Sequence, residues 1–88
     1  MFKVGKHDKV VSKQIMSNSN KKAIILYHYD SGMYQVQIVS GFLYLNTLDE
    51  IKSYKRLGNA ENFLSRLGFH GYLSQNDYME INRLISHV

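Results

Sequence analysis

Four histidines are the side chains best suited to metal binding or proton transfer at neutral pH. They are His7, His28, His70 and His87, and no two lie three to five residues apart, so the spacing of a helical zinc pair is missing. The chain has no cysteine, which excludes a disulfide framework, a thiolate zinc site and a cysteine nucleophile. We therefore expect no metal site. Only His28, beside an acidic neighbour, supports a hydrolase or nuclease hypothesis.

Carboxylates, serines and glycines give no stronger catalytic pattern. Asp30 falls in a predicted turn, and Asp49 and Glu50 fall at a predicted helix start, so each has a structural role. Ser31 and Ser40 each precede the glycine of a predicted hairpin turn and do not form a nucleophile elbow. The six glycines never form a phosphate-binding loop. We expect a protein that is not an enzyme and that uses no cofactor.

Length and composition limit the architecture to one small domain. A chain of 88 residues and 10.2 kDa has room for one hydrophobic core, so we expect a single domain over residues 1–88. The longest apolar run, residues 23–27, is as long as a strand and too short to cross a membrane. Residues 1–6 lack the apolar stretch of a secretory signal. The cytoplasm is therefore the expected compartment, with no membrane partner.

Positive charge is concentrated in a basic N-terminal segment, residues 1–22. Its only acid is Asp8, whereas residues 23–88 are close to neutral. The lysines of this segment are Lys3, Lys6, Lys9, Lys13, Lys21 and Lys22. Such a segment attracts nucleic acid or an acidic protein surface, although lysines also simply keep a small domain soluble.

Residues 23–45 have the pattern of a three-stranded β-meander. Strands are expected over 23–29 and 33–39, and Ser40-Gly41 marks a second hairpin that leads into a third strand over 42–45. A two-residue turn at Ser31-Gly32 would pair Tyr29 with Tyr34, Tyr27 with Val36 and Ile25 with Ile38. These six side chains would share one inner face, with Leu43 and Leu45, and core packing is the favoured role of its tyrosines.

The opposite, outer face of this meander carries both apolar and polar side chains, among them Leu26, His28, Met33 and Gln35. This face is too apolar to be fully solvated, so we expect it to be covered either by the N-terminal segment or by another molecule. A visiting partner would then contact the outer face and the basic residues that follow it. The candidate partner-binding residues are His28, Gln35, Gln37, Phe42, Tyr44, Lys52, Lys55 and Arg56.

Residues 47–88 have helical patterns. Thr47 and Glu50 form a capping box before a stripe of Leu48, Ile51 and Tyr54 that ends near Gly58. A second helix begins after Asn59, carries Ala60, Phe63, Leu64 and Leu67, and stops at Gly68. A last helix follows a weaker capping box of Ser74 and Asp77, with Tyr78, Ile81, Leu84, Ile85 and Val88 on one side.

The expected fold class is therefore α+β. A small antiparallel sheet, the three-stranded meander with residues 9–16 as a candidate fourth strand, would carry two or three helices packed on one face.

Two functional hypotheses follow from these patterns. The first is a small inhibitor that docks on a protein or nucleoprotein complex, of the kind that phages and mobile elements use against host defence, as anti-CRISPR proteins do. The second is direct nucleic-acid binding through the basic segment and an aromatic sheet face. Self-association through the sheet edge or the outer face, giving a homodimer, is a third alternative.

Overall fold

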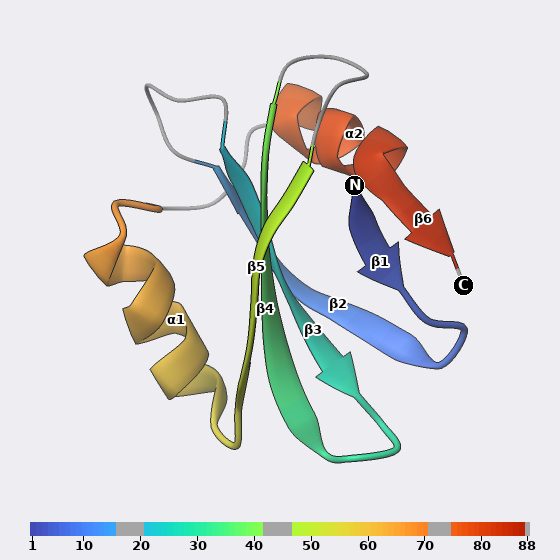
Figure 1. Ribbon diagram of the computed structural model, residues 1–88, viewed down its shortest axis with the longest axis vertical. Coiled ribbons are helices and arrows are strands. Elements are labelled where there is room, and N and C mark those ends of the chain that lie inside the picture. The colour runs from blue at the N-terminus through green and yellow to red at the C-terminus, as the bar shows by residue number, and fades with distance from the viewer. Residues whose placement is uncertain (16–20, 42–46, 71–74, 88) are drawn as a thin grey trace.

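A four-stranded antiparallel sheet forms the centre of the fold (Figure 1). The structure is a computed structural model that describes residues 1–15, 21–41, 47–70 and 75–87. In spatial order, the strands of the sheet are β2 (Asp8–Ile15), β3 (Lys22–His28), β4 (Met33–Ser40) and β5 (Thr47–Tyr54). A parallel pair joins β1 (Phe2–Val4) to β6 (Ile85–His87), and the helices are α1 (Leu57–Arg66) and α2 (Gln75–Leu84).

The central strands β3 and β4 are buried on both faces of the sheet. In β3, the four consecutive residues from Ala23 to Leu26 are each 0% exposed. Because successive side chains of a strand point to opposite faces, such an unbroken run is stable only if both faces are covered. This apolar run is therefore the sequence feature that dictates a three-layered structure.

One face of the sheet packs against α1, and we call it the α1 face. Its core consists of Ala23, Ile25, Val36 and Ile38 from the sheet, Ala60 and Leu64 from α1, and Phe69. The opposite face packs against the paired ends of the chain, and we call it the terminal face. Its core consists of Ile24, Leu26 and Val39 from the sheet, Phe2 and Val4 from β1, and Ile81 from α2.

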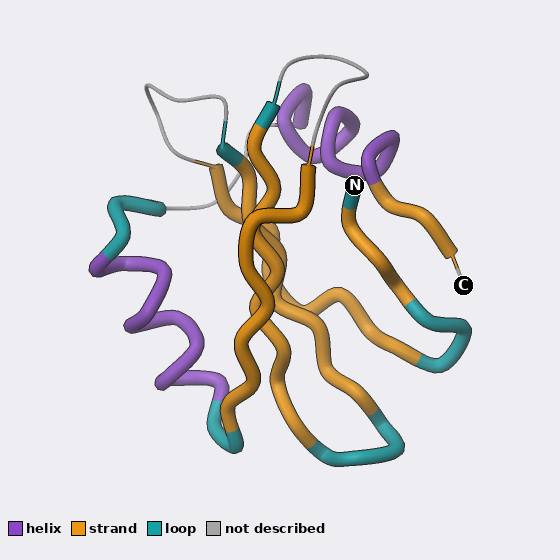
Figure 2. Tube along the Cα trace, in the orientation of Figure 1, coloured by secondary structure: helices purple, strands orange, loops and turns teal. Residues whose placement is uncertain are grey.

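The predicted packing of all helices on one face is wrong. Helices α1 and α2 lie on opposite sides of the sheet, and β1 and β6 lie beside α2 (Figures 1 and 2). Of the two covers considered for the outer face, the N-terminal segment is the one observed. Strands of three residues are too short to give a periodic signal, so the sequence did not predict β1 or β6.

The β3–β4 hairpin keeps its predicted faces but not its predicted register. Tyr27 pairs with Tyr34 and Ile25 with Val36, two residues away from the expected pairing. The connection spans residues 29–32, with Gly32 at φ 69° donating its N–H to the His28 carbonyl at 2.8 Å. Because the shift is an even number of residues, each side chain stays on the face expected for it.

Residues 47–54 form strand β5, and the helix predicted there is wrong. β5 pairs along β4, with Glu50 opposite Ile38 and Tyr54 opposite Tyr34. The Thr47 hydroxyl donates to the Ser40 carbonyl at 3.5 Å and contacts the Asp49 carboxylate at 3.3 Å, so it caps no helix. Pairing with β4 satisfies a whole row of backbone groups, which outweighs a local capping preference. The third strand expected over 42–45 lies outside the described residues.

The other predicted elements are confirmed with shifted ends. The candidate strand over 9–16 is β2, and the predicted stripes place Ala60 and Leu64 of α1 and Ile81 of α2 in the core. α1 begins at Leu57, before the expected cap at Asn59, and therefore contains Gly58. The cap residue Ser74 lies outside the described residues, and residues 85–87 leave the helical stripe to form β6.

Truncating one buried isoleucine on each face tests the two-sided core. Ile24→Ala and Ile25→Ala should each lower the free energy of unfolding by about 2–5 kcal/mol, because each leaves a cavity. Met79→Ala, at an exposed position of α2, is the control and should change it by less than about 0.5 kcal/mol. Urea unfolding measures all three. If Ile24→Ala left the free energy of unfolding nearly unchanged, the terminal face would be open.

Alanine substitutions at two glycines of the α1 region should change the stability of the protein in opposite directions. Gly68 follows the last turn at φ 92°, where its N–H reaches the Ser65 carbonyl, so Gly68→Ala should destabilise by about 1–2 kcal/mol. Gly58 lies inside the helix, and a Cβ atom added there would enter open space, so Gly58→Ala should stabilise by about 0.5–1 kcal/mol. Thermal unfolding of both variants measures the two changes in Tm. Changes of the same sign would contradict the assigned helix ends.

Candidate functional site

Gln37 fastens the N-terminal strand to the terminal face of the sheet. Its side-chain Oε1 accepts from the Lys3 backbone N–H at 2.8 Å, and its Nε2 donates to the Lys3 carbonyl at 2.7 Å and to Gln35 Oε1 at 2.8 Å. Gln37 is only 1% exposed. The amide thus pairs with β1 as a neighbouring strand would, and Gln37 is not accessible to a partner.

His28 lies on the same face and is held by Asp8, directly opposite it on β2. The His28 Nδ1 and Asp8 Oδ1 atoms are 2.6 Å apart, and Asp8 Oδ2 accepts from the Gly5 backbone N–H at 2.8 Å. His28 therefore has the acidic neighbour that the hydrolase hypothesis requires. Its Nε2, however, is buried without a hydrogen-bond partner among the described residues. Since this nitrogen does not reach solvent, the pair fastens the β1–β2 turn to β3.

A continuous row of side chains crosses all four strands on the α1 face. The strand registers pair Lys9 with Tyr27, Tyr27 with Tyr34, and Tyr34 with Tyr54. The Tyr27 and Tyr34 ring centroids are 5.0 Å apart. At the usual strand spacing, this cross-strand row is about 15 Å long. We call Tyr27, Tyr34 and Tyr54 the tyrosine row.

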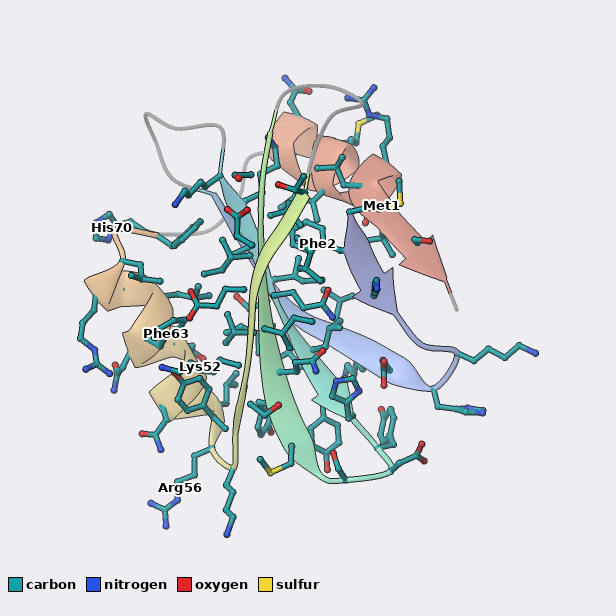
Figure 3. The ribbon with its side chains drawn as sticks, in the orientation of Figure 1. Met1, Phe2, Lys52, Arg56, Phe63 and His70 are labelled. Carbon is teal, nitrogen blue, oxygen red and sulfur yellow. The ribbon has the colours of Figure 1, made fainter. Side chains whose placement is uncertain are left out.

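Aromatic rings continue the tyrosine row at both ends. Tyr29, in the β3–β4 connection, packs edge-to-face on Tyr27 at 5.2 Å and is 60% exposed. At the other end, Phe63 of α1 lies 5.9 Å from Tyr54, and the Lys52 Nζ atom lies 4.7 Å from the Phe63 ring centroid. Figure 3 shows Lys52 and Phe63 side by side, with Arg56 extending away from the protein below them.

Basic side chains border the tyrosine row on both sides. An open depression of about 780 Å³ lies beside Tyr29, and its walls are Lys6, His7, Asp8, Lys9, Val10, Tyr29 and Asp30. On the other side, Lys55 and Arg56 follow Tyr54 directly and are exposed. Among these rings Tyr29 is exposed, and the others are half-buried beside it. An exposed aromatic ring between cations can stack on a planar group while the cations bind phosphates. This combination is the candidate site.

The structure separates the partner-binding residues predicted from the sequence. Gln35 and Gln37 bond to each other under β1, and His28 bonds to Asp8, so these three serve the fold. Lys52, Lys55 and Arg56 are exposed at the candidate site. Phe42 and Tyr44 lie outside the described residues.

Tyr29 is a surface residue that the sequence did not predict. The sequence also did not place Tyr54 and Phe63 beside the other tyrosines, where both are half-buried against the α1-face core. The sequence predicts core packing for Tyr27, Tyr29 and Tyr34 on one face. Tyr34 does pack against the α1-face core and Tyr27 is half-buried, whereas Tyr29 is exposed. The available signal was the abundance of tyrosine, seven in 88 residues, because tyrosine is amphipathic and is enriched at interfaces.

The described residues of the basic N-terminal segment, 1–15 and 21–22, are part of the folded structure and do not form a separate arm. Its lysines are spread over three elements: Lys3 lies in β1, Lys9 and Lys13 in β2, and Lys22 in β3. Lys6 lies in the β1–β2 turn beside the depression, and Lys21 precedes β3. Only Lys6 and Lys9 of this set line the candidate site.

Comparisons with known proteins give no relative from which a function can be transferred. No family model matches the chain, and no curated protein or solved structure matches it significantly. Over the described residues, no three metal-ligating side chains form a cluster, and no helix is long and apolar enough to cross a membrane.

Removing the Gln37 amide should loosen β1. Gln37→Leu keeps the side-chain size but leaves the Lys3 N–H and carbonyl without partners, which should lower the free energy of unfolding by about 1–3 kcal/mol. Hydrogen exchange at the Lys3 amide should also become faster. Gln35→Leu is the control, since it removes only one bond to Gln37 and none to β1. An unchanged exchange rate at Lys3 in Gln37→Leu would contradict the assigned role.

Proposed function

We propose that this protein is a non-catalytic binding protein that holds single-stranded nucleic acid along the tyrosine row. The observation that carries the proposal is the cross-strand row of Lys9, Tyr27, Tyr34 and Tyr54 on one face of the sheet. Tyr29 supplies an exposed ring for base stacking, and Lys55 and Arg56 supply cations for phosphates. Such a role is compatible with the cytoplasm, the compartment expected from the sequence.

Unpaired bases fit this site better than a duplex does. Stacking on tyrosine requires a free base face, and a duplex hides its base faces in the helical stack. The site also offers cations on both sides of the aromatic rings, from Lys6 and Lys9 to Lys55 and Arg56. A strand that crosses the sheet can therefore place phosphates at both borders while its bases contact the rings between them.

Two features support a non-catalytic role. The His28–Asp8 pair has its outer nitrogen buried, so it offers no proton acceptor to a bound molecule. Asp30, on the wall of the depression, is an exposed acid in the β3–β4 connection, whereas acid–base catalysis favours a carboxyl group enclosed in an apolar pocket. Over the described residues, the site therefore has the means to bind but no assembled catalytic pair.

Docking on a protein or nucleoprotein complex, as an inhibitor would, is the second candidate function. The observation in its favour is the exposed side of β5, where Ile51 is 47% exposed on a strand at the sheet edge. The sequence-based inhibitor hypothesis requires an open outer face of the sheet. That face is the terminal face, and β1 and α2 cover it. Affinity capture from the native host would favour docking if a protein, and no nucleic acid, were retained.

Fluorescence anisotropy with labelled single-stranded RNA and DNA of about 12 nucleotides tests nucleic-acid binding. The affinity should fall steeply as salt rises. Tyr29→Ala should weaken binding about 5-fold to 100-fold through the loss of one stacked base, whereas Tyr29→Phe should bind nearly as well as the wild type.

A charge-reversal pair provides the matched control. Arg56→Glu should weaken binding and lower the salt slope by about 1, because a phosphate contact is lost. Arg83→Glu makes the same charge change on α2, across the sheet from the site, and should have a much smaller effect. Absence of binding at low salt, or equal losses in the two variants, would refute the proposed site.

A further inference from the structure

Strand β5 presents an open edge. It pairs with β4 on one side, and no strand pairs with its other side in the described parts of the chain. Figure 1 looks toward this edge, with β5 nearest the viewer, α1 to one side and β1, β6 and α2 to the other. Residues 49–53 are all exposed. The edge therefore has backbone groups that an added strand can reach.

Charge along β5 changes sign at its middle. Asp49 and Glu50 come first, Ile51 follows with 47% exposure, and Lys52 comes next. Edge charges of a single sign would repel a second copy of the strand. An acid and a base on either side of Ile51 are instead complementary when two copies run antiparallel, because Glu50 of each copy then meets Lys52 of the other.

We propose that two copies of this protein form a dimer by antiparallel pairing of β5 with β5 across a two-fold axis at Ile51. In this register Ile51 faces Ile51 of the second copy, Glu50 faces Lys52, and Lys52 faces Glu50. The two sheets become one sheet of eight strands, and the interface is isologous, as in most soluble homodimers. This proposal does not depend on nucleic-acid binding.

The faces of the strand agree with this register. Glu50 and Lys52 pair with Ile38 and Val36, so both lie on the α1 face, where they meet across the dimer. Ile51 pairs with Gln37 and lies on the terminal face, where two exposed isoleucines bury each other. Antiparallel pairing about an axis perpendicular to the sheet joins like faces, so the two side chains of each contact lie on the same face: the ion pairs on the α1 face and the isoleucine pair on the terminal face.

A bulge sets the extent of the pairing. The β4–β5 register shifts between Ile38 and Val39, which leaves Asp49 as the extra residue of β5. The Asp49 carboxylate is also held by the Thr47 hydroxyl at 3.3 Å. The regular part of β5 therefore begins at Glu50, and Glu50 to Lys52 is the segment that pairs. An interface this short buries little surface, as weak and transient interfaces do. The dimer should therefore be weak, and its population should depend on protein concentration.

A single cysteine tests the register, since the chain has none of its own. Residues opposite each other in an antiparallel pair have Cα atoms about 4.5–5.5 Å apart, within the range of a disulfide. Ile51→Cys should therefore cross-link rapidly under mild oxidation. Ser53→Cys, exposed on the same strand and face, is the control: its two copies would be about 13 Å apart and should cross-link slowly.

Charge reversal tests the ion pairs. Glu50→Lys and Lys52→Glu should each raise the dimer dissociation constant at least about 10-fold by placing like charges opposite each other, and the double variant should restore it. Light scattering over a concentration series measures the constant, and circular dichroism verifies the fold. A wild-type chain that stays monomeric near millimolar concentration, Ser53→Cys cross-linking as fast as Ile51→Cys, or a double variant that fails to recover would each overturn the proposal.

Discussion

Burial of β3 and β4 on both faces is the constraint on which the rest of the structure depends. Four consecutive residues from Ala23 to Leu26 are inaccessible to solvent, so neither face of the sheet can remain open. The chain of 88 residues therefore has to cover both faces of the sheet. Helix α1 packs on the α1 face, and the two ends of the chain pack on the terminal face. The parallel pairing of β1 and β6 follows from this need, because it brings Phe2 and Val4 onto the terminal face.

Double coverage also decides which surfaces remain for binding. With both faces covered over the middle of the sheet, the surfaces of the sheet that stay accessible in the described residues include the β5 edge and the end near the β3–β4 connection. The tyrosine row lies at that end, with Tyr29 exposed beyond it and Arg56 extending from the neighbouring connection (Figure 3). Polar side chains on the terminal face stabilise the fold instead. Gln37 fastens β1, and Asp8 joins His28 to the β1–β2 turn.

The sequence predicted those parts of the fold whose signal is local and strong. Alternation identified β4, β-branched and aromatic residues identified β3, and the stripe that places Ala60 and Leu64 on one side identified α1. The sequence could not predict β5, because a helix-capping pattern at Thr47 competes with a ladder to β4 that depends on distant residues. For the candidate site, the shared face of Tyr27 and Tyr34 was predictable. Their position at the uncovered end depends on where α1 packs, which no local pattern encodes.

The most direct measurement of the central claim is a titration of the isotopically labelled protein with a single-stranded oligonucleotide, followed by NMR. The account requires the largest shift changes at Tyr29, at Tyr34 and at the Lys55-Arg56 pair, with β1 and α2 nearly unchanged, because the terminal face is closed. Shift changes centred on β1 and α2 would contradict the account, as would a spectrum that does not respond at low salt.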